Sequence, residues 1–283
     1  MADGYRVRAM TRAEVDTAVD WAGVEGWNPG ARDAACFAPV DPHGFIGGFL
    51  DGEMIASISV VNYDETLAFL GFYIVAPAHR GKGYGYRLWQ AGVAHAGDRL
   101  IGLDGVPAEQ ENYKRSGFGL AYRNIRFGGV PTATPDATRG LAVRPVAAAD
   151  DAIAALDARV FPVPRRQFLD AWLSAEGHVA RAVYRGGDLA GFAVARPCRA
   201  GWKIGPLTAV DRAAAETLLA AQLAEIGPGA EIFLDTPEPN AEAVALAEAI
   251  GLAPVFETAR MYTGPAPALD IAKVFGVTTF ELG

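Results

Sequence analysis

A glycine-rich turn, residues 80–85 (RGKGYG), is the feature that most constrains how this chain folds. Ala68 to Val75 before it is apolar and predicts a strand, while Leu88, Trp89 and Val93 after it recur at helical spacing. Successive glycines between a strand and a helix let backbone N–H groups converge, and the start of the helix adds a positive dipole. The turn therefore predicts a phosphate-binding site.

Spacing separates three kinds of phosphate-binding loop. A Walker loop requires a lysine after its last glycine and then a serine or threonine, whereas Lys82 precedes Gly83 and no hydroxyl residue follows. A dinucleotide fingerprint requires a third glycine where Tyr86 stands. Both loops are excluded, and the pattern that remains is R-x-x-G-x-G, which begins at Arg80.

The longer string from Val75 to Gly85 resembles the GNAT superfamily of acetyl-CoA-dependent N-acetyltransferases, whose members carry V-x-P-x-x-R-G-x-G-x-G before an amphipathic helix. Its fixed positions are all filled, by Val75, Pro77, Arg80, Gly81, Gly83 and Gly85. The resemblance implies that acetyl-CoA binds here, with its pantetheine arm along the strand edge and its pyrophosphate on the turn. The cofactor contacts that it implies are Ile74, Val75, Arg80, Gly81, Lys82, Gly83, Tyr84, Gly85 and Asn112.

Tyr113 is the predicted general acid. Residues 112–118 (NYKRSGF) resemble the family's tyrosine-x-x-x-Gly-Phe segment, in which the tyrosine lies by the CoA sulfur. A tyrosine, with a pKa of about 10, can protonate the departing thiolate. Many relatives carry an asparagine where Val106 stands, so Asn112 or Gln110 would have to supply its cofactor contact. The alternative is that Tyr113 only packs under the last strand.

The acceptor amine must lose a proton before it attacks, and a carboxylate or a histidine acting through water can accept that proton. In relatives, the segment around Trp27 shapes the acceptor site. We expect Glu25, Trp27 and Asp33 to contact the substrate, with the Trp27 ring and the Glu25 charge suited to a cation. His43 and His79 are further candidates for the base. The alternative is a solvated Glu25 and a core position for Trp27.

The chain is long enough for two domains, and its second half repeats the order of the first. Residues 141–146, followed by a predicted helix, mirror residues 5–10. A stretch rich in Pro, Thr, Gly and Ala separates the halves and is typical of a linker. We predict an α/β (α+β) fold of two tandem GNAT-like domains, each a mixed, mostly antiparallel twisted sheet flanked by helices. The predicted parts are a catalytic domain (1–130), a linker (131–140) and a degenerate domain with a C-terminal tail (141–283).

The second half lacks the glycine string. Its equivalent segment, Ile204 to Ala213, offers no place for a phosphate, and Ala247 stands where the first half has Tyr113. The chain thus resembles tandem acetyltransferases with an active N-terminal and a degenerate C-terminal domain, the latter ending in a tail like Phe275 to Gly283. In such proteins the second domain either stabilises the first or walls the acceptor cleft, and we favour the second role.

Composition excludes several classes of protein. The formal net charge of -8 disfavours a general nucleic-acid binder. No apolar run approaches the roughly 20 residues that cross a bilayer, so we expect no membrane partner and a cytoplasmic location. Cys36 and Cys198 form neither a disulfide framework nor a metal-binding pair. We predict that both are reduced core residues and that no metal is required.

The sequence therefore predicts an N-acetyltransferase that moves an acetyl group from acetyl-CoA to the primary amine of a small molecule or an amino acid by direct attack. Two alternatives remain open. One is acetylation of a protein or peptide, and the other is a regulatory module that binds acyl-CoA without turnover. The oligomeric state is not predicted.

Overall fold

The computed structural model describes residues 4–283. The first half comprises β1 (Tyr5–Ala9), α1 (Arg12–Val24), α2 (Asp33–Phe37), β2 (Phe45–Leu50), β3 (Glu53–Asn62), β4 (Leu67–Val75), η1 (Pro77–His79), α3 (Tyr84–Ala96), β5 (Leu100–Gly105), η2 (Pro107–Glu109), α4 (Gln110–Arg115) and β6 (Gly119–Gly129). The second half comprises β7 (Leu141–Pro145), α5 (Asp151–Asp157), α6 (Arg166–Ser174), β8 (Val179–Arg185), β9 (Asp188–Pro197), β10 (Trp202–Ala209), α7 (Arg212–Ile226), β11 (Ile232–Pro237), α8 (Ala241–Ala249), β12 (Ala253–Tyr262), η3 (Ile271–Lys273) and β13 (Val274–Gly276).

Local patterns predicted many of these elements. The capping box of Thr11 and Glu14 opens α1, where the Glu14 carboxylate accepts from the Thr11 N–H at 2.7 Å. Residues 45–50 and 54–61, joined by a turn at Asp51 and Gly52, have the sequence pattern of a β-hairpin, which forms as β2 and β3. The stretch from 130 to 140 runs without a helix or strand. The helix predicted after residues 141–146 forms as α5, whereas helices α2 and α6 were not predicted.

The strands form one sheet in the order β1-β2-β3-β4-β5-β12-β6-β11-β10-β9-β8-β7, with β13 paired to β10 beside it. Counted inward from one edge, the sheet begins with β1 to β5 in chain order. Counted inward from the other edge, it begins with β7 to β11 in chain order, so the two halves have the same arrangement. Neighbouring strands are antiparallel except for the pairs β4–β5 and β10–β11, which are parallel. The predicted mixed, mostly antiparallel fold is confirmed.

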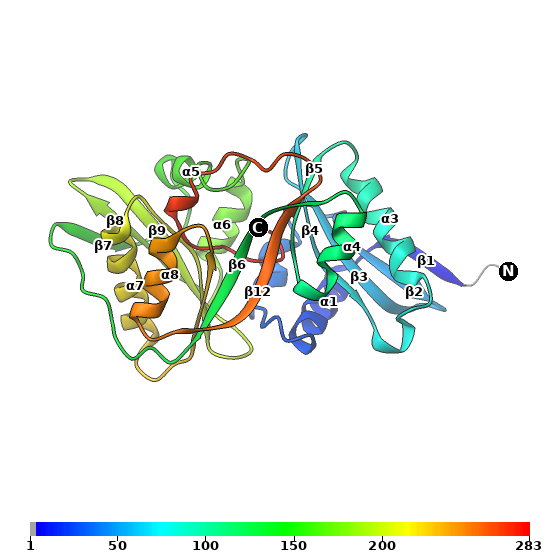
Figure 1. Ribbon diagram of the computed structural model, residues 1–283, viewed down its shortest axis with the longest axis horizontal. Coiled ribbons are helices and arrows are strands. Elements are labelled where there is room, and N and C mark those ends of the chain that lie inside the picture. Colours follow the sequence, from blue (N-terminus) through cyan, green and yellow to red (C-terminus); the bar gives the residue numbers. More distant parts are fainter. Residues whose placement is uncertain (1–3) are drawn as a thin grey trace.

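The two halves exchange their last strands at the centre of the sheet. β12 lies between β5 and β6, and β6 lies between β12 and β11, so each half completes the sheet of the other (Figure 1). The sequence did not predict this exchange. A buried ion pair fastens each exchanged strand: Arg260 of β12 lies 2.7 Å from Asp104 of β5, and Arg126 of β6 lies 2.6 Å from Asp235 of β11. Removing one partner of such a pair typically costs about 3–5 kcal/mol of stability.

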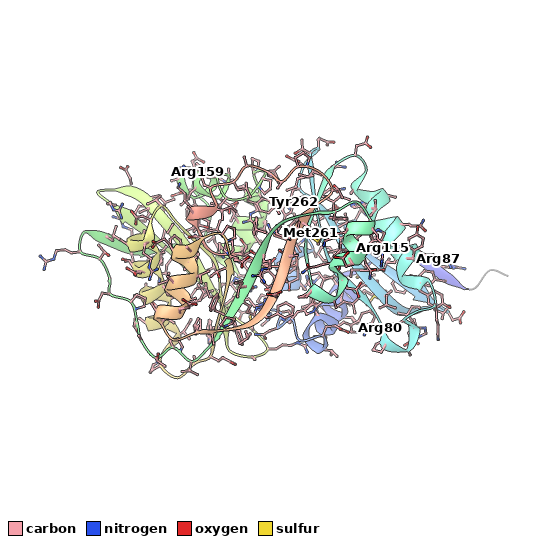
Figure 2. The ribbon with its side chains drawn as sticks, in the orientation of Figure 1. Arg80, Arg87, Arg115, Arg159, Met261 and Tyr262 are labelled. Carbon is pink, nitrogen blue, oxygen red and sulfur yellow. The ribbon has the colours of Figure 1, made fainter. Side chains whose placement is uncertain are left out.

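The exchanged strand β12 also enters the core of the first half (Figure 2). Met261 is fully buried there together with Leu88 of α3 and Leu103 of β5. Tyr262 packs opposite Gly102, where a Cβ would come within 2.9 Å of the tyrosine ring. The first half therefore depends on the second for its own packing.

Helices cover both faces of the sheet. On one face α3 packs on β2 to β4, while α7 packs on β8 to β10 and α8 on β11. On the other face, α1 and α2 of the first half and α5 and α6 of the second contribute to one apolar core, which we call the shared core. The rings of Phe37 and Trp172 stack there at 5.7 Å. The halves are thus joined by a common core as well as by the sheet.

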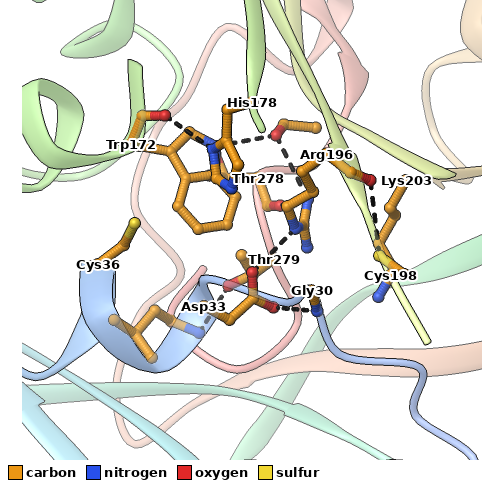
Figure 3. A network of polar contacts seen from close by, with 12 residues as sticks. Gly30, Asp33, Cys36, Trp172, His178, Arg196, Cys198, Lys203, Thr278 and Thr279 are labelled. Atoms are coloured by element: carbon orange, nitrogen blue, oxygen red, sulfur yellow. Dashed lines mark hydrogen bonds and ion pairs between the residues drawn. The ribbon is translucent and has the colours of Figure 1, made fainter. Parts of the chain in front are cut away.

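A polar network is buried in the same interface (Figure 3). Asp33 of α2 and Arg196 of β9 are fully buried and pair at 3.1 Å. Asp33 also accepts from the N–H of Gly30 at 2.7 Å, and Arg196 lies 4.6 Å from the centre of the Trp172 ring. This corrects the expectation that Asp33 contacts the substrate, because its carboxylate is engaged in joining the two halves.

The cysteines are free in the structure, as predicted, although only Cys36 is buried and Cys198 is half-buried. Burial raises the pKa of the Cys36 thiol to about 11, which keeps it protonated. Within residues 4–283, none of the helices combines the length and the apolar character that crossing a membrane requires.

The strand exchange predicts that neither half is stable alone. Expressed by itself, a fragment of residues 1–140 lacks the strand that covers β5 and exposes its share of the shared core, so we expect it to be expanded or aggregated. Adding residues 141–283 in trans is expected to restore one compact species. Size-exclusion chromatography and near-UV circular dichroism measure both states. Cooperative unfolding of the isolated fragment as a compact monomer would contradict the prediction.

Candidate active site

The parallel strands β4 and β5 are hydrogen-bonded only along the first half of β4. They are paired from Leu67 to Leu70, after which β4 continues without β5. At that point the register of β4 against β3 shifts and Phe72 adopts a φ of +47°, while the Ser57 hydroxyl donates to the Phe72 carbonyl at 2.8 Å. Such a bulge bends a strand locally. Here it opens a gap between two neighbouring strands.

A cavity of about 660 Å³ occupies this gap. Its wall comes from both halves: β4, β5, the glycine-rich turn and α4 belong to the first, while β12 and the C-terminal tail belong to the second. The volume lies in the range typical of sites for small molecules.

The glycine-rich turn forms part of the wall through Arg80, Gly81, Gly83 and Gly85. Gly81 and Gly83 have φ values of +73° and +84°, which glycine adopts without strain. A Cβ at Gly85 would come within 2.8 Å of the Tyr73 hydroxyl. No side chain in residues 4–283 caps the start of α3. Its first N–H groups are therefore available to an anion.

In the second half, the N-terminus of the corresponding helix, α7, is capped by the side chain of its N-cap residue. Asp211 is its N-cap and accepts from the N–H of Ala214 at 3.0 Å, and Arg185 donates to the same carboxylate at 2.7 Å. A carboxylate therefore stands where α3 leaves room for an anion. This gives a physical reason for the predicted failure of the second half to bind phosphate.

The gap between β10 and β11 is also closed. These strands are paired in parallel up to Ile204, as β4 and β5 are in the first half. Beyond that point β13 lies against β10, with Gly276 opposite Leu207, and the Val277 N–H donates to the Asp235 carbonyl at 2.7 Å. The C-terminal segment thus fills in the second half the space that is a cavity in the first.

Tyr113 lines the cavity from α4. Its ring stacks on Trp89 at 5.8 Å and packs so closely on Gly105 that a Cβ there would come within 2.7 Å. Burial, and then the nearby Glu109 and Tyr73, raise the pKa of Tyr113 well above its ordinary value. The phenol is therefore neutral at physiological pH and can donate a proton.

The remaining wall is aromatic and acidic. Besides Tyr113, its aromatic residues are Trp27, Phe72, Tyr73, Tyr86, Phe256 and Phe280, and its acidic residues are Glu25, Asp104, Glu109 and Glu281. The carbonyl of Trp27 accepts from Arg126 at 2.9 Å and from Lys203 at 3.4 Å, which holds the Trp27 segment against the second half. Trp27 therefore lies in the cavity wall, and its contact with the substrate stays a prediction.

Some predicted cofactor contacts lie in the wall and others do not. Val75, Arg80, Gly81, Gly83 and Gly85 line the cavity. Ile74, Lys82, Tyr84 and Asn112 lie outside it.

The positions outside the wall have physical explanations. The side chain of Ile74 alternates with that of Val75 along β4 and enters the shared core. Lys82 is exposed, and Tyr84 packs on Tyr5 with 4.8 Å between the ring centres. The Asn112 amide is engaged by Glu109 and Arg115 within its own helical segment.

Glu25 lines the cavity, but it faces the glycine-rich turn, where its carboxylate pairs with Arg80. Arg80 also donates to the Val75 carbonyl at 2.8 Å, so its guanidinium is held across the end of β4. Glu25 therefore lies on the cofactor side predicted for Arg80. Its role as an acceptor contact stays a prediction.

Two further residues of the wall, Asp104 and Glu281, were not predicted from the sequence. A signal for Asp104 existed, because the pattern I-x-L-D ends β5 and recurs at Asp235 in β11. Glu281 has no comparable signal, since it reaches the cavity only through the path of residues 263–283 across both halves.

Comparison with family models supports two related halves. Residues 10–118 match a model described as the acetyltransferase (GNAT) family, and residues 153–276 match one described as an acetyltransferase (GNAT) domain.

One curated relative is similar over nearly the whole chain. It is the holothin acyltransferase of Pseudoalteromonas sp. (strain SANK 73390), 34% identical over 265 residues that cover 93% of this chain and 90% of the relative.

Two solved structures share the fold. A putative acetyltransferase from Pyrococcus horikoshii superimposes with a TM-score of 0.83 at 22% identity, covering 100% of this chain and 97% of that one. A tandem GNAT protein from the clavulanic acid biosynthesis pathway has a TM-score of 0.66 at 15% identity, covering 93% and 99% of the two chains.

Proposed function

Because the chain belongs to the GNAT acyltransferase family, with a GNAT domain in each half, we propose that it transfers an acetyl group from acetyl-CoA to the amine of a small molecule or an amino acid. One observation carries the proposal: a single cavity joins the glycine-rich turn, Tyr113 and an aromatic wall. The transfer needs an anion site, a proton donor and an acceptor pocket, and this cavity provides all three.

The turn is the proposed cradle for the CoA pyrophosphate. The N–H groups from Gly81 to Gly85 and the start of α3 supply hydrogen bonds and a positive dipole, and Arg80 supplies charge. The edge of β4 that β5 leaves unpaired accommodates the pantetheine arm beside Val75. These groups bind and orient the donor without taking part in bond making.

Tyr113 is the proposed general acid. As the acceptor nitrogen bonds to the acyl carbon, the bond from that carbon to sulfur breaks and the sulfur takes the phenolic proton. A phenol is protonated at neutral pH, so its proton is in place when the sulfur leaves. A neutral phenol in a largely buried site suits this task.

The acceptor is proposed to be a small molecule. A wall with seven aromatic residues, Tyr113 included, and a volume of about 660 Å³ suits a compact, partly apolar amine. The name of the holothin acyltransferase supports the same class of substrate. Acetylation of a protein or peptide is the competing enzymatic activity, and binding of acyl-CoA without turnover is the competing role outside catalysis.

The turn assignment predicts that Gly83→Glu abolishes acetyl-CoA binding. A glutamate there places a side chain and a negative charge where the pyrophosphate is proposed to lie. Gly52→Glu is the matched control, because Gly52 also has a positive φ, of +91°, but lies in the turn between β2 and β3, outside the cavity wall. Isothermal titration calorimetry measures the affinity of both variants for acetyl-CoA, and Gly52→Glu is expected to keep it. An unchanged affinity in Gly83→Glu would refute the assignment.

The acid assignment predicts that Tyr113→Phe lowers kcat by about 10²- to 10⁴-fold with a modest change in KM, because the proton donor is lost while binding is retained. Release of free thiol from acetyl-CoA over a panel of amines measures this. Tyr184→Phe, on β8 of the second half, is the control and is expected to keep full activity.

The same assay separates the competing roles. Turnover of small amines supports the proposal, and turnover of peptides alone supports the protein acetyltransferase. Tight acetyl-CoA binding without thiol release on any amine or peptide supports the regulatory module.

A further inference from the structure

Glu281, near the C-terminus, lines the cavity between the two halves. The residue is only 3% exposed, and its Oε2 atom is buried without a hydrogen-bond partner among residues 4–283. Buried carboxyl groups are normally hydrogen-bonded or paired, because their desolvation is otherwise uncompensated. The position of Glu281 therefore requires an explanation.

The other acidic residues of the wall are already engaged. Glu25 pairs with Arg80, Asp104 pairs with Arg260, and Glu109 accepts from Asn112. Of the four acidic residues that line the cavity, Glu281 alone has no such partner within the described part of the chain. Glu281 is thus the acidic residue of the wall whose carboxyl group is not already engaged by another described residue.

The tail holds Glu281 in a fixed place. The Tyr63 hydroxyl donates to the Leu282 carbonyl at 2.9 Å, and Arg165 donates to the Gly283 carbonyl at 2.9 Å. The backbone of Glu281 itself packs on Gly71, where a Cβ would collide with the Glu281 carbonyl oxygen. Gly71 follows the last β4 residue paired with β5, so Glu281 sits where the gap begins.

The charges around Glu281 come from several elements. Lys203 of β10, Arg126 of β6 and Arg196 of β9 act on it as cations, and Asp33 of α2 acts as an anion. Burial is the largest influence and raises the pKa of Glu281 above its ordinary value, with Lys203 as the strongest opposing charge. A carboxyl group with a raised pKa is a stronger base once ionised.

We propose that Glu281 is the general base that takes the proton from the acceptor nitrogen, supplied to the active site of the first half by the tail of the second. This inference rests on the acyl transfer proposed above. The nitrogen forms its bond to the acyl carbon, the carbon–sulfur bond breaks, and the sulfur takes the proton of Tyr113. The proton of the nitrogen passes to Glu281, and both side chains then return to their starting states by exchange with water.

Glu281→Gln tests this assignment, because it keeps the shape of the side chain and removes its basicity. With acetyl-CoA and benzylamine, tryptamine or aniline as acceptor, we expect kcat/KM to fall by about 10²- to 10⁴-fold. The affinity for CoA in calorimetry and the melting temperature are expected to be retained. In Glu281→Ala, added formate is expected to restore part of the activity, which a packing role would not allow.

Glu257→Gln is the matched control. Glu257 lies on the neighbouring strand β12, between the cavity residues Phe256 and Thr258, but its own side chain is 41% exposed and pairs with Arg123. The same chemical change there is expected to leave turnover at the wild-type level.

Two results would overturn the role of Glu281 alone: wild-type turnover in Glu281→Gln, or a loss of turnover that comes with loss of folding or of CoA binding. A wild-type enzyme that acylates none of these amines nor any other would overturn the proposed function as well. The two failures are therefore distinguishable.

Discussion

The pairing of β6 with β12 is the contact on which the rest of the molecule depends. On its other side, β12 of the second half pairs with β5 of the first, and β6 of the first half pairs with β11 of the second. Neither half therefore forms a complete sheet by itself. The exchange carries Phe256 and Thr258 into the wall of the cavity. The cavity is consequently built by both halves, even though the residues proposed to bind and protonate CoA belong to the first.

The two halves differ chiefly in what fills the gap between their parallel strands. In the second half β13 lies against β10 and leaves no room for a pantetheine arm, while Asp211 neutralises the start of α7. The same chain segment then continues to Phe280 and Glu281 in the wall of the first half. One tail therefore fills the gap in the second half and lines the cavity in the first.

Local sequence predicted what local interactions determine. The glycines of the turn, the capping box at Thr11 and the β2–β3 hairpin each depend on neighbours within a few residues, and each formed as expected. The strand exchange could not be predicted in this way, because β6 and β12 have the same local pattern whether they complete their own half or the other. For the same reason Asp33 was misplaced: its partner Arg196 is 163 residues away in the chain.

A comparison of the two halves also distinguishes residues that hold the sheet together from residues with a proposed chemical role. The pair of Arg260 with Asp104 recurs as Arg126 with Asp235, in a half whose gap is filled, so the pair serves the sheet and not catalysis.

The residues with a proposed role in acyl transfer occur in one half only. Tyr113 has Ala247 as its counterpart, and the uncapped Gly83 at the start of α3 has Asp211 as its counterpart at α7. Asp104 lines the cavity but belongs to the repeated framework, whereas Glu281 lines it and belongs to the tail that has no second copy. Repetition thus assigns Asp104 to structure, and the lack of repetition is consistent with a chemical role for Glu281.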